Sequence, residues 1–123
     1  MIYAYITDYE GTKNAIKIGY TKRDVEGRVH AQCSQVGVNY TILNSWDAKK
    51  RNGKDIMDKQ VHRLLEERGF KKCVSGSATE WFYCELKDVE NAVRDIVVGA
   101  LKWVDTVEKI IKKSAWQITK FML

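Results

Sequence analysis

The chain opens with two strand-like segments joined by a turn, and this opening constrains the fold more than any other feature. Residues 2–7 (IYAYIT) and 15–20 (AIKIGY) are rich in β-branched and aromatic side chains, which favours extended structure. Between them, residues 10–13 (EGTK) form a turn sequence of hairpin length. A chain that begins with a hairpin and later mixes strands with helices is typical of the α+β class and not of a doubly wound sheet.

Helical spacing begins after the second strand-like segment. Asp24 is a typical helix N-cap, and apolar residues recur behind it every three or four positions until Gly37 ends the run. These apolar residues are Val25, Val29, Cys33 and Val36. Residues 40–46 (YTILNSW) again favour a strand. The sequence therefore predicts a first helix with one buried face, followed by a third strand.

The second half of the chain repeats this alternation of helix and strand. We expect Asp55 to open a second helix that stops at Gly69, and residues 80–85 (EWFYCE) to form a short fourth strand. Asp88 then caps a helical pattern that runs towards the C-terminus. The expected fold is α+β, with a small mixed or antiparallel sheet flanked by helices and a long C-terminal helix. Its sheet would contain the N-terminal hairpin plus one or two further strands.

Composition limits the classes of protein that remain. With 123 residues, 45% of them hydrophobic, the chain can bury one core. Its three cysteines form no CxxC pair, which argues against a disulfide framework and against a zinc site of the usual spacing. No window holds the roughly 18 apolar residues that a membrane span needs, and the N-terminus lacks the basic flank of a signal peptide. We therefore expect a cytoplasmic protein.

The charge balance points to a polyanionic partner. The formal net charge is +5 at pH 7. Lysine and arginine side chains displace condensed counterions from phosphates, so a basic chain of this kind suits nucleic acid.

Several polar residues stand at positions where they could carry chemistry. Tyr3 and Tyr5 share one face of the first strand, because successive side chains of a strand alternate. Residues 17–21 (KIGYT) end the second strand, where a glycine lets a backbone or a ligand approach closely. The remaining candidates come from later elements: Arg28, His62, and Glu80 with Trp81 and Phe82 behind it.

In this order and spacing, these segments resemble the GIY-YIG nuclease superfamily. They look closest to its phage and bacterial subgroup, in which the second half-motif reads KIG and a late EWF follows. The matching pieces are residues 2–6 (IYAYI), 17–21 (KIGYT), 26–28 (EGR), His62 and 80–82 (EWF). The resemblance covers about residues 2–95. It implies a metal-dependent DNA endonuclease of phage or mobile-element type, with a nuclease domain at residues 1–95 and a C-terminal extension at 96–123.

The resemblance also implies a role for each candidate in phosphodiester hydrolysis, which needs a nucleophilic water and a stabilised phosphate. By similarity, Tyr5 lies beside the attacking water as general base or as its orienting partner, with Tyr3 as the alternate register. Arg28 would clamp the scissile phosphate, since a guanidinium binds phosphate through two hydrogen bonds. Glu80 would hold one Mg²⁺ (or Mn²⁺) ion, and His62 would assist proton transfer or contact phosphate.

Lys17 departs from the family pattern, in which the second half-motif begins with tyrosine. A lysine can bind phosphate or lower the pKa of a nearby tyrosine, but it cannot act as the same phenol. Tyr20 is a nearby phenol, yet strand alternation places it on the opposite face from Lys17. The departure leaves a second hypothesis open: a degenerate domain that binds nucleic acid or a protein partner without cutting.

Basic residues outside this set predict contacts with the DNA backbone, which position a duplex without reading its sequence. One group ends and follows the second strand, and the other forms a charged loop before the helix that carries His62. The predicted nucleic-acid-binding residues are Gly19, Tyr20, Lys22, Arg23, Lys49, Lys50, Arg51 and Lys54.

The C-terminal segment predicts self-association. Its apolar residues alternate at spacings of three and four, as in a short heptad run. They include Val97, Ala100, Val104, Val107, Ile111, Ile118 and Phe121. We expect either a homodimer through this helix or a helix that bends near Ser114 and returns to its own domain.

Overall fold

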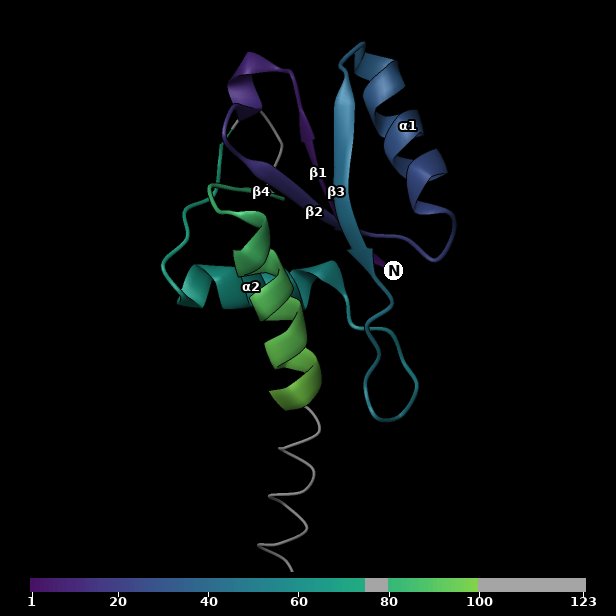
Figure 1. Cartoon of the computed structure of the whole chain (residues 1–123), viewed down its shortest axis with the longest axis vertical. Helices are drawn as coiled ribbons and strands as arrows, with labels where there is room; N and C mark the ends of the chain where they lie inside the picture. Colours follow the sequence, from purple (N-terminus) through teal and green to yellow (C-terminus); the bar gives the residue numbers. More distant parts are fainter. Residues whose placement is uncertain (75–79, 100–123) are drawn as a thin grey trace, which may run out of the picture.

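The computed structural model describes residues 1–74 and 80–99, and it contains one four-stranded antiparallel sheet within those residues (Figure 1). The strand order is β3-β1-β2-β4. The strands are β1 (Ile2–Thr7), β2 (Ile16–Tyr20), β3 (Tyr40–Trp46) and β4 (Trp81–Phe82). The predicted α+β class and the N-terminal hairpin are therefore confirmed, with two further strands added at opposite edges of the hairpin.

The hairpin sets the register from which the rest of the sheet is built. Tyr5 stands opposite Lys17, and Tyr3 stands opposite Gly19. The turn between the strands contains a short 3-10 helix, η1 (Glu10–Thr12). Because side chains alternate along a strand, Tyr3 and Tyr5 lie on one face of the sheet, as predicted.

The first helix, α1 (Val25–Val36), begins and ends where the sequence predicts. The Asp24 side chain accepts a hydrogen bond from the Gly27 backbone N–H at 3.0 Å, so one of the unpaired donors of the first turn is satisfied. Gly37 ends the helix in the left-handed conformation, at φ 69°, which a residue with a side chain adopts at a cost.

The second helix, α2 (Asp58–Glu67), begins later than predicted. Asp55 does not open it, because the Asp55 carboxylate is bound outside the helix by Lys49 and by the Tyr20 hydroxyl. Met57 occupies the N-cap position instead, and the Gln60 side chain accepts a hydrogen bond from its backbone N–H at 3.1 Å. The predicted stop is close to the observed one, since Gly69 follows with φ 88°.

A third helix begins at residue 86 and is described as far as residue 99. The predicted N-cap of this helix, Asp88, is wrong. Asp88 lies inside the first turn, and its carboxylate accepts a hydrogen bond from the Glu85 backbone N–H at 2.8 Å. The fourth strand is also shorter than the predicted 80–85. The predicted heptad run lies outside the described residues beyond position 99.

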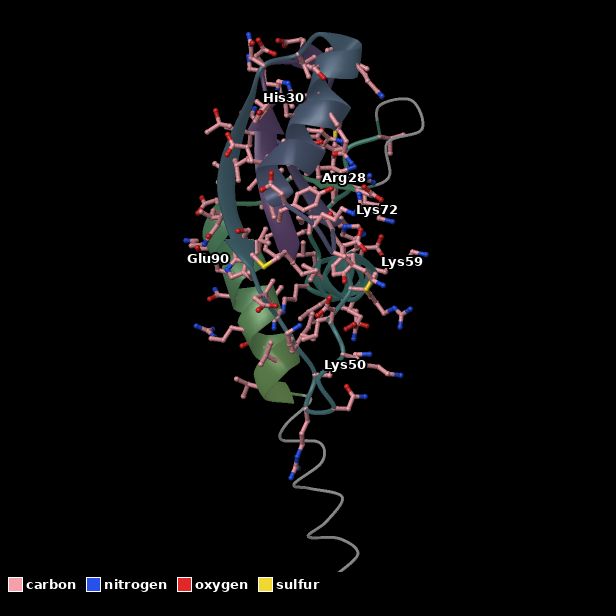
Figure 2. The ribbon with its side chains drawn as sticks, turned by 90° about the vertical axis from the view of Figure 1, so that its right-hand side faces the viewer. Arg28, His30, Lys50, Lys59, Lys72 and Glu90 are labelled. Atoms are coloured by element: carbon pink, nitrogen blue, oxygen red, sulfur yellow. The ribbon has the colours of Figure 1, made fainter. Side chains whose placement is uncertain are left out.

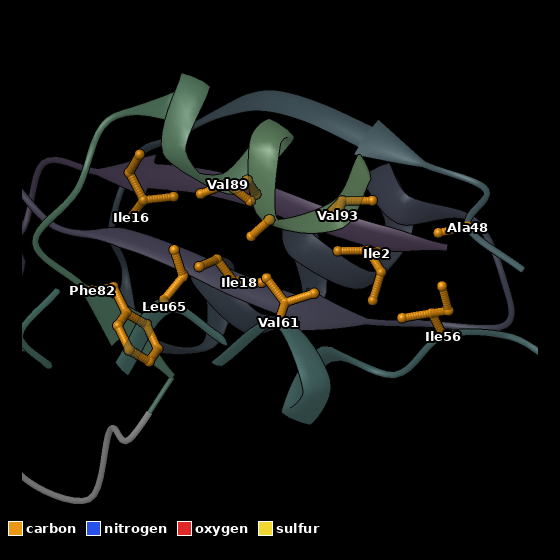
Figure 3. Packing of buried hydrophobic residues seen from close by; sticks show 12 residues of the cluster. Ile2, Ile16, Ile18, Ala48, Ile56, Val61, Leu65, Phe82, Val89 and Val93 are labelled. Carbon is orange, nitrogen blue, oxygen red and sulfur yellow. The ribbon is translucent and has the colours of Figure 1, made fainter. Parts of the chain in front are cut away.

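Two buried clusters occupy the two faces of the sheet. On one face, α2 and the helix at 86–99 pack their apolar side chains against alternate residues of the hairpin (Figure 3). The other face carries the tyrosine pair with Trp81, and the α1 residues Val29 and Cys33 cover it. Glu80 directly precedes Trp81, so it lies at the sheet edge where these two layers meet.

Candidate active site

The centre of the candidate site is formed by Tyr5, Lys17 and Glu80. Tyr5 and Lys17 face each other across the first two strands. The Lys17 ammonium forms an ion pair with the Glu80 carboxylate, and its side chain is only 14% exposed. The backbone holds this carboxylate in place, because the Ile18 N–H donates to the Glu80 carbonyl at 3.1 Å. The hairpin and the segment that leads into β4 thus bring together three residues that are far apart in the sequence.

Aromatic packing surrounds the Tyr5 ring on two sides. Tyr3 stacks against it with ring centroids 6.0 Å apart and planes 16° from parallel. Trp81 meets it edge-on at 5.6 Å. These contacts leave Tyr5 only 4% exposed, so its hydroxyl depends on fixed polar partners.

Gln32 supplies those partners, and the sequence analysis did not single it out. The Tyr5 hydroxyl donates to Gln32 Oε1 at 3.0 Å, and Gln32 Nε2 donates to the Tyr3 hydroxyl at 3.4 Å. Its position could have been found from helix periodicity, since Gln32 follows Arg28 by four residues and shares its side of α1. One amide group on α1 therefore orients both tyrosines.

Arg28 lies one turn before Gln32 and is exposed. It lines a hollow of about 470 Å³ together with Gly27 and residues 21–24. Lys22 and Arg23, both predicted to bind nucleic acid, are part of the same lining. This hollow therefore contains three cationic side chains, while the carboxylate of Asp24 is engaged in capping α1.

Burial determines the protonation state of Tyr5. Removal from solvent is the largest cause that raises the pKa of the Tyr5 phenol far above its ordinary value of 10, and nearby Cys33 and Tyr3 raise it further. The Glu80 carboxylate also raises it. At neutral pH, Tyr5 is therefore a neutral phenol that donates a hydrogen bond to Gln32.

Gly19 is required by Tyr3. The Tyr3 phenol lies over the backbone of β2, in the space that a Cβ atom at position 19 would occupy. The close approach predicted at this glycine is thus made by a side chain of the chain itself, and Gly19 is buried.

His62 reaches the site region from the other face of the sheet. It is 9% exposed, its Nε2 donates to the Ile18 carbonyl at 2.8 Å, and its ring lies 5.3 Å from that of Phe82. It shares with Glu80 a hollow of about 280 Å³ beside α2. The structure thus groups Tyr5, Lys17 and Glu80 directly. Arg28 lies one helical turn before Gln32, which binds Tyr5, and His62 lines a hollow together with Glu80.

Tyr20 and the basic loop form a separate unit on the face opposite Lys17. The Tyr20 hydroxyl and Lys49 Nζ both bind the Asp55 carboxylate, Lys49 at 2.7 Å. These two hydrogen bonds, that of Lys49 first, lower the pKa of Asp55 to about 2. The backbone then turns through Gly53, at φ 83°. The remaining predicted cations of this group lie in the turn: Lys50, Arg51 and Lys54.

A divalent metal ion would find a limited set of ligands here. The described residues contain no group of three or more His, Cys, Asp or Glu side chains that could hold one. Glu80, 39% exposed, is the carboxylate of the site, and it shares its charge with Lys17. The residues therefore fit an ion such as Mg²⁺ that takes a single protein carboxylate and keeps most of its waters.

The family model of the T5orf172 domain matches residues 2–97, well over half of the chain. The chain belongs to the T5orf172 domain family. This domain is related to nucleases of the GIY-YIG/HNH-like superfamily, and Tyr5, Lys17, Gln32 and Glu80 of the T5orf172 domain all lie within the matched range. No curated protein and no solved structure matches the chain.

Among the residues that the structure describes, no helix is both long and apolar enough to cross a membrane.

Proposed function

We propose that this T5orf172 domain is a metal-dependent DNA endonuclease that hydrolyses phosphodiester bonds. The observation that carries the proposal is the grouping of Tyr5, Lys17 and Glu80 on neighbouring strands of the sheet. Arg28 lies on α1 one helical turn before Gln32, the residue that binds Tyr5. Relationship to nucleases and a net charge of +5 support it.

Each residue has a role that matches its surroundings. Arg28 is exposed in a cationic hollow and clamps the scissile phosphate, because its planar fork donates two parallel hydrogen bonds. Tyr5 remains protonated and orients the attacking water through its oxygen lone pairs, while its own proton is held by Gln32. Of the two roles expected for this tyrosine, orientation of water fits the raised pKa better than general base catalysis.

Glu80 would hold the divalent ion. When bound, Mg²⁺ or Mn²⁺ would neutralise charge on the phosphate and lower the pKa of water. Lys17 forms an ion pair with the Glu80 carboxylate and adds a positive charge beside the reacting phosphate. His62 supports the backbone of β2 at Ile18, which is the residue that anchors Glu80.

Plasmid nicking tests this proposal. Supercoiled plasmid is incubated with the full chain and Mg²⁺ or Mn²⁺, beside the Glu80→Ala and Arg28→Ala variants. We expect nicked plasmid from the unaltered chain and a loss of several orders of magnitude in Arg28→Ala, because a lost phosphate clamp acts on the transition state. Cleavage by Arg28→Ala at the unaltered rate would contradict the assigned role.

One observation favours a second candidate function, which is binding of nucleic acid or a protein partner without cleavage. The ion pair with Lys17 already satisfies Glu80, the carboxylate proposed to hold the metal. If that pair excludes the ion, the domain binds DNA without cutting it. Retention of labelled duplex without nicking at any concentration of Mg²⁺ or Mn²⁺ would decide for this function.

A further inference from the structure

The hollow beside α2 contains cationic side chains that no role described above uses. Its lining consists of Lys59, His62, Arg63, Glu66, Lys72 and Glu80. Three of its charges are matched within the fold: Lys72 and Glu66 pair with each other at 2.5 Å, and Glu80 pairs with Lys17. Lys59 and Arg63 form no ion pair with any residue in the ranges 1–74 and 80–99, which leaves two cations in excess.

The two cations are placed to act together. Lys59 and Arg63 are four residues apart on α2, so they are neighbours on one side of the helix. Both are exposed, and like charges at this spacing repel each other unless an anion lies between them. Lysine and arginine are also the side chains that bind phosphate oxygens in proteins. The arrangement indicates a place for one phosphate group.

The hollow lies on the same side of the molecule as the candidate site. Figure 2 shows Arg28, Lys72, Lys59 and Lys50 in succession along one side, with Glu90 of the third helix towards the opposite side. The hollow is therefore between the arginine of the candidate site and the basic loop that carries Lys50. Glu80, which belongs to both the site and the hollow, joins them.

We propose that Lys59 and Arg63 bind a backbone phosphate of duplex DNA that neighbours the scissile phosphate. This inference rests on the proposed nuclease function and extends it with a second phosphate site on α2. Lys72, which also lines the hollow, is held over the Phe82 ring, 5.9 Å from its centroid. The DNA backbone then follows one path, from Arg28 across the α2 hollow to the basic loop.

Salt dependence of binding measures such a contact. A fluorescein-labelled duplex is titrated with the full chain in EDTA, at KCl concentrations across the range in which binding weakens, and anisotropy gives the affinity. Log affinity falls as log salt rises, with a negative slope. For Lys59→Ala/Arg63→Ala, this slope should become less negative by about 0.9, the value for one lost phosphate contact. Both side chains are exposed, so thermal unfolding should be unaltered.

Two variants control for charge alone. Lys13→Ala/Arg94→Ala loses one lysine and one arginine from exposed positions away from the hollow, and its slope should equal that of the unaltered chain. Lys59→Arg/Arg63→Lys keeps both charges and should also keep the slope. In Glu66→Gln, Lys72 loses its partner and becomes available to phosphate, so binding should become tighter.

The outcomes separate this inference from the proposed function. An unchanged slope in Lys59→Ala/Arg63→Ala, or an equal change in Lys13→Ala/Arg94→Ala, overturns the α2 phosphate site while plasmid cleavage still stands. Weaker binding of the duplex by Glu66→Gln also contradicts the α2 phosphate site. A chain that neither binds the duplex nor nicks plasmid overturns both proposals together.

Discussion

The Tyr5 hydroxyl donates a hydrogen bond to Gln32 Oε1 at 3.0 Å, and the amide end of the same Gln32 side chain donates to Tyr3. A single glutamine thus determines where the protons of two stacked phenols lie. Because the Tyr5 hydroxyl donates its hydrogen bond to Gln32, its oxygen lone pairs are left to accept hydrogen bonds from other groups. The orientation of the attacking water proposed above therefore depends on Gln32, which lies outside the motifs shared with the nuclease family.

Gln32→Leu should disrupt this arrangement. Two partly buried tyrosine hydroxyls lose their partner, and we expect the free energy of unfolding to fall by about 1–2 kcal/mol. The single-turnover cleavage rate should fall by a larger factor than stability alone explains, because Tyr5 loses its fixed orientation. Urea unfolding and plasmid nicking measure the two effects. Gln35→Leu, at an exposed position of the same helix, is the matched control and should change neither.

Gly19→Ala should destabilise the fold through Tyr3. The added methyl group overlaps the phenol that lies over β2, and overpacking of this kind costs about 1–3 kcal/mol. Removal of the ring should relieve the overlap, so the same substitution in a Tyr3→Val background should cost much less. Thermal unfolding of the four proteins gives the coupling between the two sites. Equal costs in both backgrounds would show that the phenol is not the obstacle.

Asp55 should contribute to stability in a defined range of pH. Its folded pKa is about 2 and lies below the ordinary value of 3.8, so the folded state favours the carboxylate. The stabilisation is present above pH 4 and is lost as the pH falls towards 2. Asp55→Asn should therefore lower the melting temperature at pH 7 and leave it close to that of the unaltered chain near pH 2. A difference of the same size at both pH values would argue against an ionic origin.

Tyr5 should remain protonated at a pH where exposed tyrosines ionise. Its raised pKa means that the folded state holds the proton more tightly than the unfolded state, so the contribution of this phenol to stability is present below pH 10 and is lost as the pH rises further. Absorbance of phenolate near 295 nm checks this. Titration curves of the unaltered chain and of Tyr5→Phe should coincide up to pH 10, whereas a lower amplitude in Tyr5→Phe within that range would show that Tyr5 ionises normally.

Local signals in the sequence predicted the fold well where both ends of an element carry them. Asp24 and Gly37 mark the ends of α1, and both act as expected. The predicted start of α2 at Asp55 is wrong because the Asp55 side chain binds Tyr20 instead. Tyr20 lies 35 positions earlier, and no local pattern in the sequence reveals such a contact. Asp88 was misplaced for a smaller reason, since an aspartate in the first turn caps a helix from inside.

The candidate site was partly predictable for the same reason. Strand alternation was enough to place Tyr3 with Tyr5 and to separate Tyr20 from Lys17. The ion pair of Lys17 with Glu80 and the bridging role of Gln32 depend on how β4 and α1 dock on the hairpin. Both are tertiary relationships, and the sequence contains no spacing that reports them.

The position of β4 has a consequence for the order in which the protein becomes competent during synthesis. The tyrosines, Lys17 and Arg28 all leave the ribosome within the first quarter of the chain, but Glu80 reaches Lys17 only when β4 adds to the edge of β2. A nascent chain shorter than 80 residues therefore has the proposed phosphate clamp without the proposed metal ligand. If the domain is the proposed nuclease, cleavage would therefore begin only after β4 has paired with β2.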